Sequence, residues 1–139
     1  MAAEAWDELA ATLAALSTAE AASPGRVGID PRSRLRAALQ AIIELCRGRP
    51  HLYRLMWVRA EPDASVVQAA LRAQQAYLTV VAGAVGEEAA WQYGGVLLAS
   101  VHGMNSLELG GHLMDGKWPR AEELVDLLVD RVAPTAEVT

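Results

Sequence analysis

Aromatic and polar side chains recur within otherwise apolar segments of this 139-residue chain. Aromatic and methionine side chains often line small-molecule pockets, and a few convergent polar groups orient the bound molecule. We therefore predict that a small, largely apolar or aromatic ligand is bound by Tyr53, Met56, Trp57, Gln74, Tyr77, Trp91, His102 and Asn105. Ordinary core packing is the alternative for Tyr53, Met56 and Trp57, and also for His102. Trp6 and Trp118 are interpreted as anchors at helix ends.

Small residues form a second pattern, because they recur at intervals of three or four and so share one face of a helix. They are Gly95, Ala99, Gly103, Ser106 and Gly110. Glycine inside a helix costs about 1 kcal/mol relative to alanine, so close packing must offset that cost. Two partners are possible: a neighbouring helix of the same chain, or a second copy in a symmetric dimer. We predict the dimer interface from this stripe together with Leu124 and Leu128.

No motif in the sequence indicates catalysis or metal binding. A glycine-rich phosphate loop, a nucleophile elbow and a cysteine pair with metal-ligand spacing are all missing. Glu108, His112 and Asp115 could cluster, but the glycines at 110 and 111 interrupt the helix that would align them. We therefore expect no cofactor, no metal and no catalytic residue.

Two other functions stay open. In the first, the helical fold works as a small-molecule enzyme with His102 as acid or base and Asn105 or Tyr53 orienting the substrate. In the second, the chain is a protein-interaction module without a pocket, and side chains pack tightly around Trp57. The ligand-binding hypothesis instead predicts that the bulky rings surround a hollow.

Composition limits the partners and the architecture. With 53% hydrophobic and 21% charged residues, residues 1–139 are expected to form one domain with an apolar core. A net charge of −5 is the wrong sign for a chain that neutralises phosphates, so we expect no nucleic-acid binding by this chain alone. The single cysteine, Cys46, and a start without basic residues favour a cytoplasmic location. Polar residues interrupt the apolar run 89–107, so no membrane segment is expected.

The hydrophobic spacing predicts an all-α fold of about six helices in an antiparallel bundle. Their expected ranges are Ala3–Ala22, Pro31–Gly48 with Asp30 as N-cap, Pro50–Ala60, Ala64–Ala84, Glu87–Gly110 and Pro119–Val132. The predicted inner positions are Trp6, Leu9, Leu13 and Leu16 in the first helix and Leu35, Leu39, Ile42, Ile43 and Cys46 in the second. In the fourth helix they are Val67, Ala70, Leu71, Gln74, Leu78 and Val81, and in the last Leu124, Leu127, Leu128 and Val132.

Two stretches carry a family resemblance, Arg49-Pro50-His51-Leu52-Tyr53-Arg54-Leu55-Met56-Trp57 and Ser100-Val101-His102-Gly103-Met104-Asn105-Ser106-Leu107-Glu108-Leu109. In these stretches and in helix order, the chain resembles the C-terminal effector-binding and dimerisation domain of TetR-like transcriptional regulators, in the subgroup named for a Trp-His-Gly signature. The resemblance implies that the last two long helices form a homodimer interface and that the earlier helices enclose an effector pocket. It also implies a repressor that contacts DNA only through an N-terminal helix-turn-helix, a module absent from this sequence.

Overall fold

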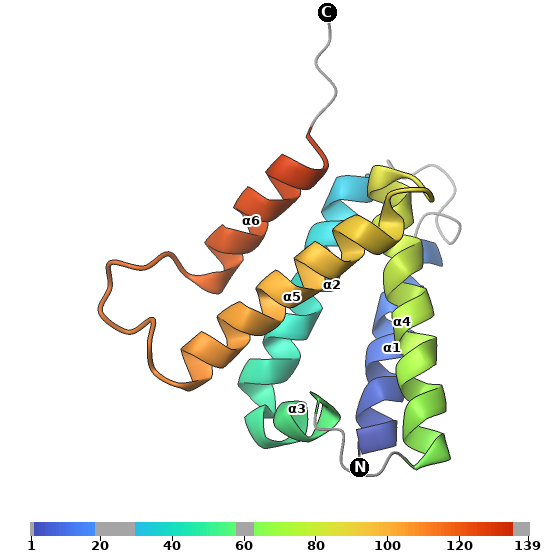
Figure 1. Cartoon of the computed structure of the whole chain (residues 1–139), viewed down its shortest axis with the longest axis horizontal. Helices are drawn as coiled ribbons and strands as arrows, with labels where there is room; N and C mark the ends of the chain where they lie inside the picture. The colour runs from blue at the N-terminus through green and yellow to red at the C-terminus, as the bar shows by residue number, and fades with distance from the viewer. Residues whose placement is uncertain (1, 19–29, 58–62, 135–139) are drawn as a thin grey trace, which may run out of the picture.

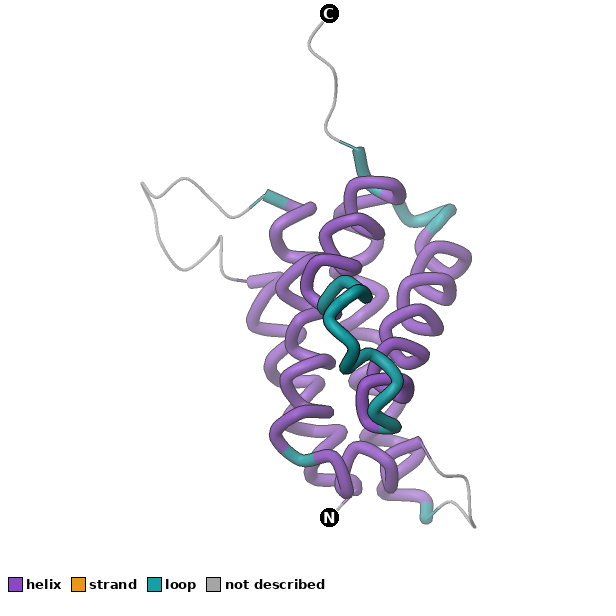
Figure 2. Tube along the Cα trace, turned by 90° about the vertical axis from the view of Figure 1, so that its left-hand side faces the viewer, coloured by secondary structure: helices purple, strands orange, loops and turns teal. Residues whose placement is uncertain are grey.

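The computed structural model describes residues 2–18, 30–57 and 63–134. Within these ranges the chain forms helices and loops and no strand, as Figures 1 and 2 show. The helices are α1 (Ala2–Thr18), α2 (Pro31–Gly48), α3 (Pro50–Trp57), α4 (Ala64–Val85), α5 (Ala90–Leu109) and α6 (Ala121–Val132). The predicted all-α class and number of helices are confirmed.

Local chemistry sets the start of α2 and both ends of α4. The Asp30 carboxylate accepts a hydrogen bond from the Ser33 amide at 2.8 Å, and Asp63 caps α4 through the Ser65 amide. Gly86 ends α4 with a φ of 89°, a left-handed conformation that favours glycine.

Two predicted starts and two predicted ends need comment. Residues 87–89 form a turn, so α5 begins at Ala90 and not at Glu87. Arg120 takes an extended N-cap conformation, so α6 begins at Ala121 and not at Pro119. The predicted ends at Ala22 and Ala60 lie outside the described residues.

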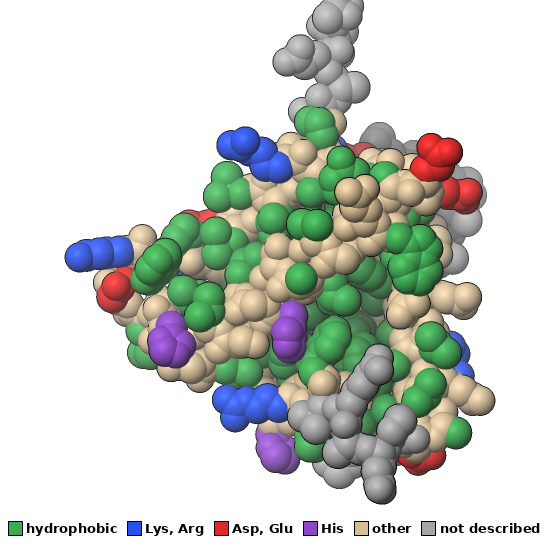
Figure 3. Space-filling view, in the orientation of Figure 1, with side chains coloured by type: hydrophobic (Ala, Val, Ile, Leu, Met, Phe, Trp, Pro, Cys, Tyr) green, Lys and Arg blue, Asp and Glu red, His purple; other side chains and the backbone are tan. Residues whose placement is uncertain are grey.

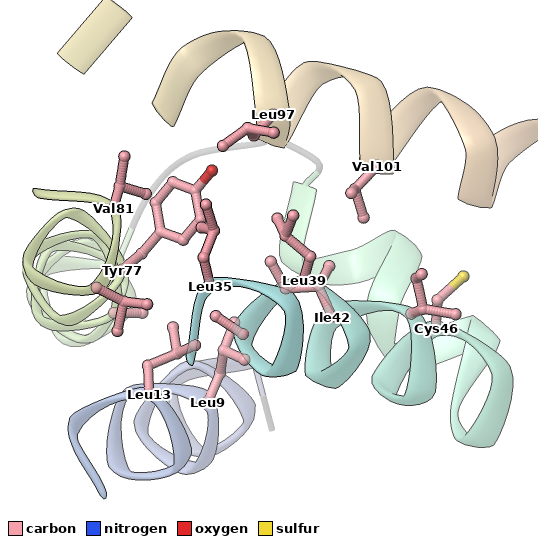
Figure 4. Packing of buried hydrophobic residues seen from close by; sticks show 14 of the residues in the cluster. Leu9, Leu13, Leu35, Leu39, Ile42, Cys46, Tyr77, Val81, Leu97 and Val101 are labelled. Atoms are coloured by element: carbon pink, nitrogen blue, oxygen red, sulfur yellow. The ribbon is translucent and has the colours of Figure 1, made fainter. Parts of the chain in front are cut away.

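Helix α2 is the centre of the fold, because it contacts every other described helix. Its predicted inner residues Leu35, Leu39, Ile42, Ile43 and Cys46 are all buried. Figure 4 shows α1 on one side of α2 and α5 on the other, with Leu9 and Leu13 pointing up from α1 and Leu97 and Val101 pointing down from α5. The predicted inner stripe of α1 is also confirmed, with Leu16 half-buried and the other three residues buried.

The inner face of α4 differs from the prediction. Its buried residues are Ala69, Ala73, Tyr77, Val80 and Val81, whereas Val67 and Leu71 are 40% and 51% exposed. Helix α4 makes its most extensive contact with α1, and the two run side by side in Figure 1. Ala69 and Ala73 allow the backbones of α1 and α4 to approach closely, so these alanines are buried while Val67 and Leu71 face outward.

The inner face of α6 differs for a similar reason. Ala121, Val125 and Val129 are fully buried, whereas Leu127 is 54% exposed and Leu124, Leu128 and Val132 are only half-buried. The smaller residues at intervals of four fit against α2 and α5. The predicted leucines therefore lie at the edge of the contact.

Ion pairs fix the direction of α6 against α2. Arg32 pairs with Asp130, Arg36 pairs with Asp126 at 2.6 Å, and Arg47 pairs with Glu122. Residue numbers rise along α2 as they fall along α6, so the two helices are antiparallel. The acidic residues at 122, 126 and 130 share one face of α6, which this row of arginines meets.

Candidate functional site

Aromatic rings from three helices meet where α1, α3 and α5 converge. Trp6 packs edge-on against Trp57 with ring centroids 5.3 Å apart, and Trp57 lies 4.8 Å from His102. Tyr53 lies 6.0 Å from Trp57 and 5.7 Å from His102. We call these four residues, together with Asn105, the aromatic cluster. Four of the ligand-binding predictions, Tyr53, Trp57, His102 and Asn105, therefore come together in space.

A chain of hydrogen bonds runs through the aromatic cluster. Asn105 Nδ2 donates to the Tyr53 hydroxyl oxygen at 3.1 Å, and that hydroxyl lies 2.8 Å from His102 Nδ1. Since the phenol oxygen accepts from Asn105, its own hydrogen is free to point at His102 Nδ1. Asn105 is fully buried, and its Oδ1 has no partner among the described residues.

The Tyr53 phenol in this chain of hydrogen bonds and the nearby Cys46 thiol are both uncharged at neutral pH. Burial raises the pKa of Tyr53 to about 12, and the hydrogen bond from Asn105 opposes that shift only in part. Burial also raises the pKa of the Cys46 thiol, so this buried thiol stays protonated at neutral pH. The site therefore offers aromatic surface together with the uncharged Tyr53 hydroxyl and Asn105 amide.

The other predicted ligand contacts lie elsewhere. Met56 is buried in the core, and Tyr77 is buried with its hydroxyl donating to the Gly94 carbonyl at 2.8 Å. In Figure 4 the Tyr77 hydroxyl points from α4 toward α5. Gln74 is exposed on α4, and Trp91 is 68% exposed. The structure thus does not bring Gln74 or Trp91 to the aromatic cluster.

The rings of the aromatic cluster contact one another and do not surround the expected hollow. Tilted and edge-to-face packing of this kind is favourable by itself, so the rings close the space between the helices. The described residues form surface grooves elsewhere. One groove, of about 410 Å³, lies between α4 and α5 beside Trp91. A second, of about 290 Å³, lies between α5 and α6 and is lined by Ser100, Met104, Leu124, Leu127, Leu128 and Arg131.

Helix α5 also has an apolar face that points away from the core. Gly95, Ala99, Gly103, Ser106 and Gly110, the predicted stripe, are all exposed. A Cβ built at Gly95 or Gly103 would meet no atom within 4 Å, so neither glycine contacts another helix of the same chain. The same-chain alternative is therefore wrong for these two glycines. At the helix end, a Cβ at Gly110 would instead clash with the His112 ring.

This outer face continues onto α6. Val96 and Leu107 on α5 and Leu127 on α6 are each about half exposed, and the half-buried Leu124 and Leu128 line the groove between the helices. Figure 3 views this face and shows hydrophobic side chains across its middle, with charged ones toward its edge. We call the exposed small residues of α5, together with Val96, Leu107, Leu124, Leu127 and Leu128, the outer face.

One cluster of ion pairs was not predicted from the sequence. Arg47 at the end of α2 donates two hydrogen bonds to the Glu108 carboxylate, at 2.9 and 2.8 Å, and also pairs with Glu122. These contacts raise the pKa of Arg47 and hold the pKa values of Glu108 and Glu122 below their usual range. The sequence did contain one signal for these ion pairs, which is the spacing of four between the acidic residues at 122, 126 and 130 of α6.

Glu108, which the sequence analysis considered together with His112 and Asp115 as a possible metal ligand, is therefore an ion-pair partner of Arg47. Among residues 2–18, 30–57 and 63–134, no three His, Cys, Asp or Glu side chains are placed to hold a metal ion. None of the helices described is long and apolar enough to cross a membrane.

Comparison with known families identifies the class of the domain. The family model described as Tetracyclin repressor-like, C-terminal domain, matches residues 35–132, which is well over half of the chain. The chain belongs to this family, as its resemblance predicted. The matching model does not specify the Trp-His-Gly subgroup, which stays a prediction. The searches of curated proteins and of solved structures found no match.

Proposed function

We propose that this chain is the ligand-sensing and dimerisation domain of a TetR-like transcriptional regulator, with a small apolar or aromatic effector and a homodimer interface on the outer face. The observation that carries the proposal is that α5 has two apolar faces, of which the single chain buries only one. A second copy would cover the exposed face and offset the cost of its glycines.

The aromatic cluster is the proposed effector site. Its rings supply apolar contact, and its buried Asn105 supplies a polar atom without a partner among the described residues. The partly exposed rings of Trp57 and His102 are where a ligand would enter. Because the rings touch in the described structure, binding requires Trp57 to move, and the effector selects this opened state.

The two sites lie on one helix, which suggests how they communicate. His102 and Asn105 face the cluster, whereas Gly103 and Ser106 face outward one residue later. An effector that shifts α5 would therefore change the spacing of the two copies. In a regulator with an N-terminal helix-turn-helix, this population shift would alter DNA binding.

Sedimentation velocity tests the dimer. The chain is expected to be a dimer at micromolar concentration, and Gly95→Gln with Gly103→Gln is expected to give a folded monomer, because the long side chains keep the two copies apart. Gly83→Gln, in α4, is the matched control, since a Cβ there comes no closer than 4.0 Å to another residue. A wild-type monomer would exclude the interface.

A thermal-shift screen tests the effector site. A compound at a hundred times its Kd should stabilise the chain by about 2.7 kcal/mol. Trp57→Ala should abolish the shift, whereas the exposed Gln68→Ala should retain it. A broad screen of apolar and aromatic compounds without any stabilising ligand would argue against effector binding.

A further inference from the structure

The hydrogen-bond chain of the aromatic cluster ends on an acceptor. Asn105 uses Nδ2 to donate to Tyr53, and Tyr53 is satisfied at both ends because it also bonds His102. Only Asn105 Oδ1 is left, fully buried and without a hydrogen bond within the described ranges. A buried acceptor in this state costs free energy until a donor reaches it.

The surrounding groups restrict what that donor can belong to. The ring nitrogens of Trp6 and Trp57 are also buried without a partner among the described residues, and both are donors. One hydroxyl or amide group can supply a hydrogen to an acceptor and accept one from an indole N–H. A hydrocarbon can do neither.

Charge is restricted as well. None of the five cluster residues is acidic, and none is lysine or arginine. The neighbouring Tyr53 phenol and Cys46 thiol stay neutral because burial raises the pKa of each. An ionised carboxylate has no hydrogen to donate to Asn105 Oδ1, and it would lose its hydration on entering a buried site, which is costly. A cation would lose its hydration and meet no acidic residue in the cluster.

From these observations we infer that the effector is an uncharged aromatic molecule with a hydroxyl or amide hydrogen that it donates to Asn105 Oδ1. This inference rests on the proposed function, since it assumes that the aromatic cluster is the effector site. It narrows the ligand class to phenol-like compounds and excludes aromatic carboxylates.

Calorimetric titration of the full chain with three matched probes tests the inference. The probes are p-cresol, p-xylene and p-toluate: p-xylene replaces the hydroxyl of p-cresol with a methyl group of similar size, and p-toluate replaces it with a charged carboxylate. We expect p-cresol to bind at least about tenfold more tightly than either of the other two, the ratio that one buried hydrogen bond supplies.

Variants locate the donor contact. Asn105→Leu should remove the preference for p-cresol over p-xylene while leaving p-xylene binding in place. Trp57→Phe keeps a ring but loses the indole N–H, and it should reduce the preference in part. Gln68→Leu, an exposed amide on α4, is the matched control and should keep the full ratio.

The outcomes separate this inference from the proposed function. If p-xylene binds as tightly as p-cresol, the donor contact is excluded while effector binding at the aromatic cluster stands. If p-toluate binds most tightly, the uncharged class is excluded. If none of the three binds at millimolar concentration, the inference fails, and the proposed function is then decided by its broader screen and by sedimentation. The wild-type ratios alone decide the matter if Asn105→Leu does not fold.

Discussion

Helix α5 carries glycine and apolar residues on two faces, one buried against other helices of the chain and one exposed. A Cβ on Gly94 would meet Leu78 at 3.2 Å and Tyr77 at 3.5 Å, so this glycine lets α4 approach. Its neighbour Gly95 meets nothing within 4 Å. The inward glycine is explained by packing within one chain, whereas the outward one has no such explanation. Neighbouring glycines can therefore serve different contacts, and the proposed dimer would explain the outward one.

The largest test of this comparison replaces one large side chain on each face. Leu97→Ala, on the buried face, should lower the free energy of unfolding by about 2–5 kcal/mol, because it leaves a cavity in the core. Val96→Ala, 51% exposed, should change it by less than about 0.5 kcal/mol in the monomer.

Urea unfolding at protein concentrations that favour the monomer checks both values, and sedimentation velocity measures self-association. Val96→Ala should weaken the dimer, whereas equal losses of stability with unchanged association would remove the distinction between the faces.

A second test acts on the polar part of the buried face. Tyr53→Phe removes the hydroxyl that bonds Asn105 and His102 and should cost about 1–3 kcal/mol, since partners are left unpaired in a buried site. Tyr93→Phe, on the exposed side of α5, is the matched control and should be near neutral. Thermal unfolding is the measurement. A neutral Tyr53→Phe would mean that the hydrogen-bond chain does not contribute to the fold.

A third test addresses the ion pairs that hold α5 and α6 together. Arg47→Gln should cost about 1 kcal/mol at pH 7, a modest amount because the partners are partly exposed. Folding lowers the pKa of Glu108 and Glu122, so their contribution is present above the unfolded pKa and is lost as the pH falls from about 5 through the lowered values.

Stability measured against pH should therefore fall less steeply in acid for Arg47→Gln than for the wild type. Arg72→Gln is the matched control, because it loses an exposed ion pair of 2.7 Å with Asp7, far from Glu108 and Glu122 in the sequence, and should keep the wild-type profile. Identical acid profiles for Arg47→Gln and the wild type would show that this pairing is not made in solution.

The smallest expected effect concerns Trp91, an exposed residue in the first turn of α5. Trp91→Ala should change the monomer's free energy of unfolding by less than about 0.5 kcal/mol, because 68% of the side chain is exposed. It should also leave p-cresol binding unchanged, since Trp91 lies apart from the aromatic cluster. A loss of binding in the calorimetric titration would place Trp91 in the effector site after all.

Much of the fold was predictable from local patterns. Asp30 with Pro31 and Asp63 mark helix starts, and Gly86 marks an end, because capping depends on a few neighbouring residues. The inner side of α2 was also predictable, since its large apolar residues recur at helical spacing and leave little choice of face.

The inner sides of α4 and α6 were not predictable in this way. Both helices carry apolar residues on more than one face, and only the neighbouring helices decide which face is buried. Close contact with α1 selects Ala69 and Ala73, and the ion pairs with α2 help to select Val125 over Leu127.

The candidate site was likewise predictable only in part. The amino-acid sequence alone determined the helices, the family and the small-residue stripe, because these depend on spacing along one element. Only the tertiary structure decided that Trp6 joins Tyr53, Trp57 and His102, and that Gln74 and Trp91 do not. Such contacts join residues far apart in the chain, and their geometry depends on how several helices pack at once.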